Sequence, residues 1–236
     1  MQTVATIAKR EFGAYFKSPV AYIVLSVYLL LSGFFFFNQL YLRQNASLEP
    51  FFDNMPLLFL FFGPAIAMRL LAEERGSGTI ELLLTMPVRD WEIVLGKYLG
   101  ALGMLSVGVF LTLPFAITVA KLGPLDTGPT FGGYLGTILL GGTYLAIGLF
   151  ASATTKNQII AFIIGLAICF ALFLMGQFTS AAGPTLGKVL EYMSPQFHFS
   201  GIQRGVIELR NVVYYLSTIA VVLLLTVQVL ESRKWR

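Results

Sequence analysis

Charged residues divide the sequence into six long apolar stretches. Runs without Asp, Glu, Lys or Arg cover residues 18–42, 54–68, 98–120, 127–155, 157–187 and 211–230. Five of the six are 20 residues or longer, and a helix of about 20 apolar residues crosses a hydrocarbon core of roughly 30 Å. The second run has 15 residues and spans only if residues 51–53 reach one interface while Arg69 snorkels at the other. We therefore predict six transmembrane helices, at about 18–42, 51–70, 98–120, 130–153, 157–180 and 211–230.

The first residues show a different periodicity. Residues 3–17 place apolar side chains at helical spacing, with Lys9, Arg10 and Glu11 elsewhere on the helical wheel. This pattern is typical of an amphipathic helix that lies in the membrane interface, with a frayed tail as the alternative. The apolar run that follows has 25 residues, which is too long for the core of a signal peptide, so we do not expect a cleaved signal.

Composition and charge distribution indicate the class and the orientation. Hydrophobic residues make up 56% of the chain and charged residues 12%, about half the charged fraction of a soluble domain. With the N-terminus inside, the cytoplasmic side collects eleven of the 16 Lys and Arg residues and the outer side five, which satisfies the positive-inside rule. We predict an all-α, multi-pass protein of the inner (cytoplasmic) membrane, embedded in the lipid bilayer, with both termini cytoplasmic.

Several kinds of chemistry are missing from the sequence. One histidine, His198, and one cysteine, Cys169, offer neither a His-rich nor a thiolate metal site. No G-x-x-x-x-G-K-[ST] phosphate loop occurs, so we expect no catalytic residue and no nucleotide hydrolysis in this chain. The net charge of +4 does not indicate nucleic-acid binding. Because the six runs contain no Asp, Glu, Lys or Arg, coupling to an ion gradient is disfavoured, and energy is expected to enter from outside the spans.

The largest cytoplasmic loop, 69–97, is the natural entry point for that energy. Thr79 fits a helix N-cap, Glu81 lies in the first turn where the helix dipole favours a carboxylate, and Pro87 ends the segment. The sequence therefore predicts a short helix over 80–86, whose leucine face suits docking into a groove of a soluble partner. Asp90 is expected to cap a long helix that continues into the third span.

An outer segment, 188–210, separates the last two spans and is interrupted at Ser194-Pro195. After the interruption, an apolar stripe recurs at helical spacing and consists of Phe199, Ile202, Val206 and Leu209. The stripe predicts a short interfacial or partly re-entrant helix, with an ordinary loop as the alternative. His198 lies between two phenylalanines, and we interpret it as a structural, hydrogen-bonded histidine.

The loop and the order of the elements closely resemble the ABC type-2 (ABC-2) export permease family. The matching residues are Glu73, Glu74, Arg75, Gly78, Thr79, Glu81, Leu83, Leu84, Pro87, Val88, Gly96 and Lys97. The resemblance covers essentially the whole chain: an amphipathic N-terminal helix, six spans, the cytoplasmic loop of 73–90 and a short helical segment on the outer side. Within the family, the compact size and the stretch 194–217 resemble permeases of the gliding-motility type.

The resemblance implies an ATP-driven exporter in which this chain is the non-catalytic membrane subunit. ATP and Mg are then expected in a separate ABC ATPase subunit, with a second permease protomer completing a homodimer or pseudo-dimer and an auxiliary membrane subunit as a possible further partner. The residues implied to contact the ATPase are Glu73, Glu74, Arg75, Gly78, Thr79, Glu81, Leu83, Leu84 and Pro87. The residues implied for the connecting helix are Ile7, Lys9, Arg10, Phe12 and Phe16, and those of the outer segment are His198, Phe199, Ile202 and Arg204.

Other interpretations of the same pattern stay open. The charges at 73–75 also suit a solvated loop that carries helix-end charges. The whole chain also suits a membrane scaffold, in which ATPase motion drives an envelope machine without a transported substrate, or a secondary transporter or channel.

Overall fold

The chain is helical throughout the part that the structure describes. This structure, a computed structural model, describes residues 2–43, 47–79, 88–179 and 183–232. Six stretches in these ranges are long and apolar enough to cross a membrane: Pro19–Tyr41, Met55–Gly76, Asp90–Leu122, Thr127–Thr154, Gln158–Gln177 and Leu209–Glu231. The prediction of an all-α membrane protein with six spanning helices is therefore confirmed.

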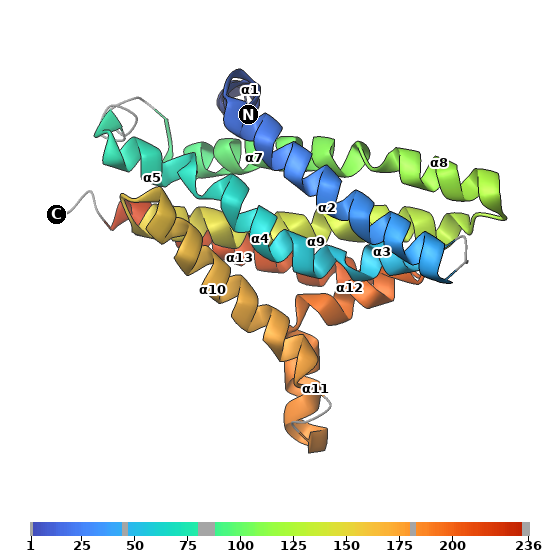
Figure 1. The fold of residues 1–236 in the computed structure, drawn as a ribbon. Helices are drawn as coiled ribbons and strands as arrows, with labels where there is room; N and C mark the ends of the chain where they lie inside the picture. The colour runs from blue at the N-terminus through green and yellow to red at the C-terminus, as the bar shows by residue number, and fades with distance from the viewer. Residues whose placement is uncertain (1, 44–46, 80–87, 180–182, 233–236) are drawn as a thin grey trace.

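The helices form a bundle in which several of the long ones run side by side, whereas others lie across it (Figure 1). In chain order they are α1 (Gln2–Lys17), α2 (Pro19–Arg43), α3 (Glu49–Asp53), α4 (Met55–Ala67), α5 (Arg69–Gly76), α7 (Asp90–Phe110), α8 (Leu113–Leu122), α9 (Thr127–Thr154), α10 (Gln158–Gln177), α11 (Gly183–Met193), α12 (Pro195–Gln203) and α13 (Leu209–Glu231). The end of α13, α5 and the N-terminal helix lie toward one end, which we call the termini end. The opposite end, with α3 and the turn between α8 and α9, is the far end.

Two spans differ in detail from their predicted ranges. The second was expected to include residues 51–53, but these belong to the separate helix α3, which ends where the Asn54 side chain donates to the carbonyl of Pro50 (2.7 Å). The third span, expected from residue 98, continues a helix that begins at Asp90, and the prediction of one long helix through this region is confirmed. The departure is an interruption between α7 and α8. Pro114 has no N–H to donate there, and Tyr134 of α9 donates to the carbonyl of Thr112 (3.0 Å).

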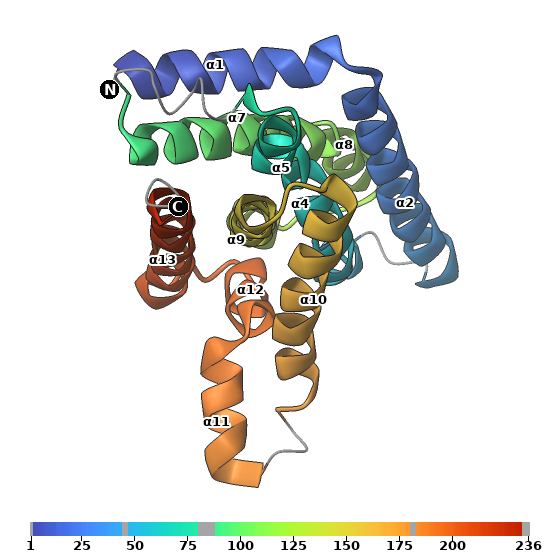
Figure 2. The same cartoon turned by 90° about the vertical axis from the view of Figure 1, so that its left-hand side faces the viewer.

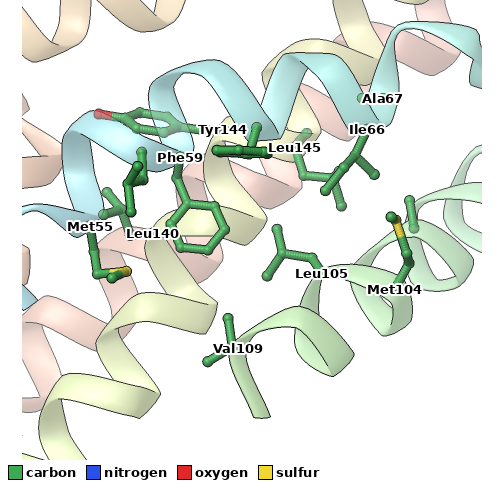
Figure 3. Close-up of a cluster of buried hydrophobic side chains, with 14 of the residues drawn as sticks. Met55, Phe59, Ile66, Ala67, Met104, Leu105, Val109, Leu140, Tyr144 and Leu145 are labelled. Atoms are coloured by element: carbon green, nitrogen blue, oxygen red, sulfur yellow. The ribbon is translucent and has the colours of Figure 1, made fainter. Parts of the chain in front are cut away.

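Helix α9 forms the centre of the bundle and is buried along most of its length. It contacts α4, α7, α10, α12 and α13. Figure 3 shows Tyr144 and Leu145 of α9 packed against Phe59 of α4, with Leu105 of α7 facing them. A Cβ atom on Gly148 would lie 2.8 Å from both Ala67 and Pro64, so glycine is required where α9 and α4 approach each other.

The N-terminal helix α1 lies across the bundle. Figure 2 looks nearly along α9 and α13, whereas α1 runs across the view beside α7. Glycines of α7 permit this close approach, because a Cβ on Gly96 would lie 2.7 Å from Ile7 and a Cβ on Gly100 would lie 2.7 Å from Glu11. A helix in this orientation does not span with the others, which suits the interfacial position predicted for residues 3–17.

The segment between α10 and α13 contains two short helices with different surroundings. Helix α12 packs on α9, where Phe199 and Ile202 are buried against the glycines of the first turns. The predicted helix ends there, and the expectation for the second half of its stripe is wrong, because Val206 and Leu209 lie beyond the end of α12. The reason is local, because α12 ends at Gln203 and Gly205 turns the chain with a φ of +86°. Helix α11 projects away from the bundle in both views.

Candidate functional site

Three elements meet at the termini end around one buried ammonium group. The side chain of Lys97, in the second turn of α7, is 1% exposed. Its Nζ lies 2.7 Å from Oε1 of Glu74 on α5 and 3.1 Å from Oε1 of Glu11 on α1. A buried ammonium requires such partners, since an unpaired charge away from water is strongly destabilising. We call these three residues the charge triad.

The triad also lowers the pKa of one of its carboxyl groups, that of Glu11. Burial by itself raises the pKa of Glu11, but the Lys97 ammonium and the Arg10 guanidinium outweigh it and hold the pKa below its ordinary value of 4.5. Arg10 lies 3.0 Å from Glu11. The second carboxylate oxygen of Glu74, Oε2, is buried and has no hydrogen-bond partner within the described ranges. One strong acceptor at this site is therefore unused.

The position of Glu11 corrects the sequence prediction. Glu11 was expected on the polar side of the amphipathic helix, but it faces α7 together with Ile7, and Tyr15 is buried on the same side of α1. Residues 7, 11 and 15 are four apart and share one face of a helix, so this spacing was the available signal. Tyr15 is buried and donates to the carbonyl of Ile66 (2.8 Å), and the Arg69 guanidinium lies 4.6 Å from the centre of its ring.

Helix α5 is bonded to the central helix α9 through the hydroxyl of Ser152 and the guanidinium of Arg75. Ser152 Oγ donates to the carbonyl of Met68 (2.8 Å) and accepts from the amides of Leu71 (3.1 Å) and Ala72 (2.9 Å). Arg75, also buried, donates from its guanidinium to the carbonyl of Ala153. Sequence reasoning missed Ser152, because nothing in the local pattern of α9 distinguishes a serine that bonds a neighbouring helix from one that bonds its own.

An open cleft lies beside the triad, between α1, α5 and α7. Its walls include Arg10, Glu73, Ser77 and Thr79 as well as the triad itself. Ser77 and Thr79 hydroxyls lie 2.9 Å apart, and Thr79 Oγ1 donates to the carbonyl of Glu74 (3.3 Å). The cleft therefore combines charged groups and hydroxyls at the surface of the termini end.

One family of known proteins matches nearly the whole chain. Residues 5–232 match the family described as "ABC-2 family transporter protein". The chain belongs to the ABC-2 transporter family. A search of curated proteins found no match. The resemblance stated from the loop residues is thereby confirmed for the family, and this ABC-2 protein is a membrane permease subunit of an ABC transporter.

The structure distributes the predicted coupling residues of this ABC-2 permease over different environments. Glu73 is exposed, Glu74 belongs to the triad and Arg75 is buried against α9. Gly78 has a φ of +73°, a conformation that favours glycine, and precedes the exposed Thr79. The predicted helix of 80–86 lies outside the described residues, as do Glu81, Leu83, Leu84 and Pro87.

The N-cap residue of helix α7 lies one position before the predicted one, Asp90. The N-cap is Arg89, whose amide donates to Oε2 of Glu92 (3.1 Å), and Asp90 is the first helical residue. Among the predicted connecting-helix residues, Ile7 and Phe12 contact glycines of α7, and Phe16 packs on Phe12 with ring centres 5.0 Å apart. Lys9 and Arg10 are exposed.

The other predicted group of residues lies toward the far end of the ABC-2 bundle, away from the triad. His198 is fully buried, with Nδ1 2.8 Å from Asn211 Oδ1, Nε2 3.0 Å from the carbonyl of Tyr192, and its ring stacked on Tyr214. This is the environment of a structural histidine. Phe199 and Ile202 are core residues, whereas Arg204 is exposed.

Proposed function

We propose that this permease is an exporter subunit, driven by a separate ABC ATPase that binds at the termini end. The observation that carries the proposal is the charge triad, because it joins three separate elements through one buried ammonium. A displacement imposed on α5 is then transmitted to α1 and α7 together. On this proposal the termini end is cytoplasmic, the membrane is the inner membrane, and ATP and Mg are bound by the ATPase.

The contacts of α5 support a route for the motion into the spans. Ser152 connects the first turn of α5 to α9, and Arg75 connects its last turn to the same helix. Helix α9 in turn contacts α3, α4, α7, α10, α12 and α13. A load applied to residues 73–79 therefore acts on the best-buried helix of the permease and, through Lys97, on α7. Tilting of these helices would open a substrate path between two protomers.

The cleft beside the triad supports a cationic contribution from the ATPase. Glu73 is exposed, so its carboxylate is accessible to a partner protein. A Lys or Arg side chain of the ATPase would pair with Glu73 at the wall of the cleft, with the segment 79–86 docking next to it. Charge-assisted hydrogen bonds of this kind orient partners as well as bind them.

The proposal is tested by copurification of the tagged permease with a coexpressed ABC ATPase. The double variant Glu81→Lys, Leu84→Ala should insert normally but lose the copurifying ATPase or the stimulation of its activity, because it reverses one charge and removes one apolar anchor. The matched control is Lys121→Glu, Asp126→Lys, which changes charges on the opposite side and should bind ATPase normally. Unchanged binding and activity in the first variant would contradict the proposal.

Orientation and energy source have their own measurements. Single cysteines at Ser77 and Ser47, in a Cys169→Ser background, should react from opposite sides of the membrane with an impermeant reagent. Collapse of the proton gradient at constant ATP should leave activity intact. Labelling from one side would refute the orientation, and loss of activity would favour a secondary transporter.

A further inference from the structure

Helix α11 projects from the bundle, and we call it the arm. Its C-terminal end, the base, is held by hydrogen bonds, whereas much of its surface is exposed. Figures 1 and 2 show it leaving the side of the bundle, apart from the other helices except at its ends. Large apolar side chains on the arm and at the start of α12 are exposed: Val189, Tyr192, Met193 and Phe197. Exposed apolar side chains in one patch mark an interaction surface or a lipid-facing one.

The base of the arm is fixed to the flank of a spanning helix. Tyr214 donates to the carbonyl of Met193 (2.5 Å), and Tyr215 donates to the carbonyl of Pro195 (2.6 Å). These tyrosines lie five and six residues after Leu209, where α13 begins, which places them about 8–9 Å along that helix. The arm therefore leaves the bundle below the far end rather than from its tip.

The surface of the arm carries charges that suit a protein neighbour better than lipid. Lys188 and Glu191 line the same hollow as Tyr192, Phe197 and Arg210. Neither Lys188 nor Glu191 forms a salt bridge within the described part of the chain. A charged side chain in the hydrocarbon region costs about 3 kcal/mol, so a neighbour that supplies the opposite charge is favoured over acyl chains.

The direction of the arm determines which neighbour satisfies it. Helix α11 runs across the direction of α9, as Figures 1 and 2 together show. A second copy with the same orientation in the membrane is related by a two-fold axis parallel to α9, and that rotation reverses the direction of α11. Two arms would therefore meet antiparallel. A cation and an anion three residues apart are then self-complementary, as an isologous interface requires.

We propose that α11 is the contact between two copies of this permease. An axis centred between Val189 and Leu190 sets Lys188 opposite Glu191 of the partner subunit, and the reverse contact forms at the same time. The exposed apolar residues at the base of each arm are covered by the partner's arm. This inference names the contact surface of the dimer, and it rests on the proposed function only in assuming that the permease acts as a dimer.

Charge exchange tests the contact. Two differently tagged copies are coexpressed, and the fraction that copurifies is measured for Lys188→Glu, for Glu191→Lys and for the double exchange. Each single reversal places like charges together twice per dimer, so copurification should fall about tenfold. The double exchange should restore it. Recovery by the double variant also shows that the single variants were not merely misfolded.

A cross-link separates this inference from the proposed function. Val189→Cys, in a Cys169→Ser background, should form a covalent dimer on oxidation, whereas Ile23→Cys on the exposed side of α2 should not. A dimer that copurifies without a cross-link at 189, or that ignores both charge reversals, would refute α11 as the contact while leaving the exporter proposal intact. Absence of any copurification would overturn both the contact and the dimer.

Discussion

Replacement of Lys97 by methionine removes the cation of the charge triad and keeps nearly the same side-chain length. The two carboxylates bind the same ammonium at 2.7 and 3.1 Å, so their oxygens are at most about 6 Å apart. At that separation and an effective dielectric constant of about 20, two negative charges repel by about 3 kcal/mol. Removing one partner of a buried ion pair typically costs about 3–5 kcal/mol. We expect the free energy of unfolding to fall by that amount.

The neutral triple variant Glu11→Gln, Glu74→Gln, Lys97→Met distinguishes charge from packing. It has no uncompensated charge, and neutral replacements of buried ion pairs are often tolerated, so its free energy of unfolding should return to within about 1 kcal/mol of the wild type. Reversible unfolding in mixed micelles with increasing denaturing detergent measures all variants. The exposed Lys156 at the same end provides the control, and Lys156→Met should change the free energy of unfolding by less than about 0.5 kcal/mol.

Two outcomes would refute the reasoning about the triad. One is a Lys97→Met variant as stable as the wild type, and the other is a triple variant no more stable than Lys97→Met. The triple variant also separates stability from coupling. If the triad transmits motion, this variant should fold and bind the ATPase but stimulate its activity less than the wild type does.

Other contacts give three further predictions, each measured by the same detergent titration. Ser152→Ala removes the hydroxyl that bonds three backbone groups of the second span and should lower the free energy of unfolding by about 1–3 kcal/mol. Gly148→Ala should lower the free energy of unfolding by about 1–3 kcal/mol, which is the usual cost of overpacking. Its control is Gly13→Ala, where a Cβ atom meets open space, and this change should raise the free energy of unfolding by up to about 1 kcal/mol. The lowered pKa of Glu11 means that its contribution is complete above pH 4.5, the ordinary value, and is lost as the pH falls through the folded-state pKa. This acid loss should be absent from the neutral triple variant, and its persistence there would contradict the assignment.

Much of the fold follows from local sequence alone, because the bilayer imposes a simple requirement. A span must satisfy its own backbone and present about 20 apolar residues, and the six charge-free runs meet this requirement along the chain. The boundaries were less predictable where a short polar feature interrupts a run. Asn54 caps α3 through its hydrogen bond to the carbonyl of Pro50, and Pro114, which has no N–H to donate, lies in the first turn of α8 after the interruption of the third span. The number of apolar residues in a run does not reveal such interruptions.

The candidate site was predictable in its location but not in its contacts. The loop after the second span could be singled out by its charges and by family resemblance, since both are written in neighbouring residues. The partners within the triad are 86 and 23 residues apart. Helical periodicity relates only residues a few positions apart and cannot pair residues this distant. The sequence therefore could not distinguish the paired Glu74 from the exposed Glu73.

The sequence by itself therefore determined that this chain is a six-span membrane protein of the ABC-2 family, because hydrophobic length and local motifs are properties of consecutive residues. The tertiary structure alone decided that Glu11 faces α7, that Ser152 holds α5 and that α11 leaves the bundle sideways. Each of these depends on how separate helices cross. A glycine can be identified as necessary for close packing only when the position of the opposing helix is known.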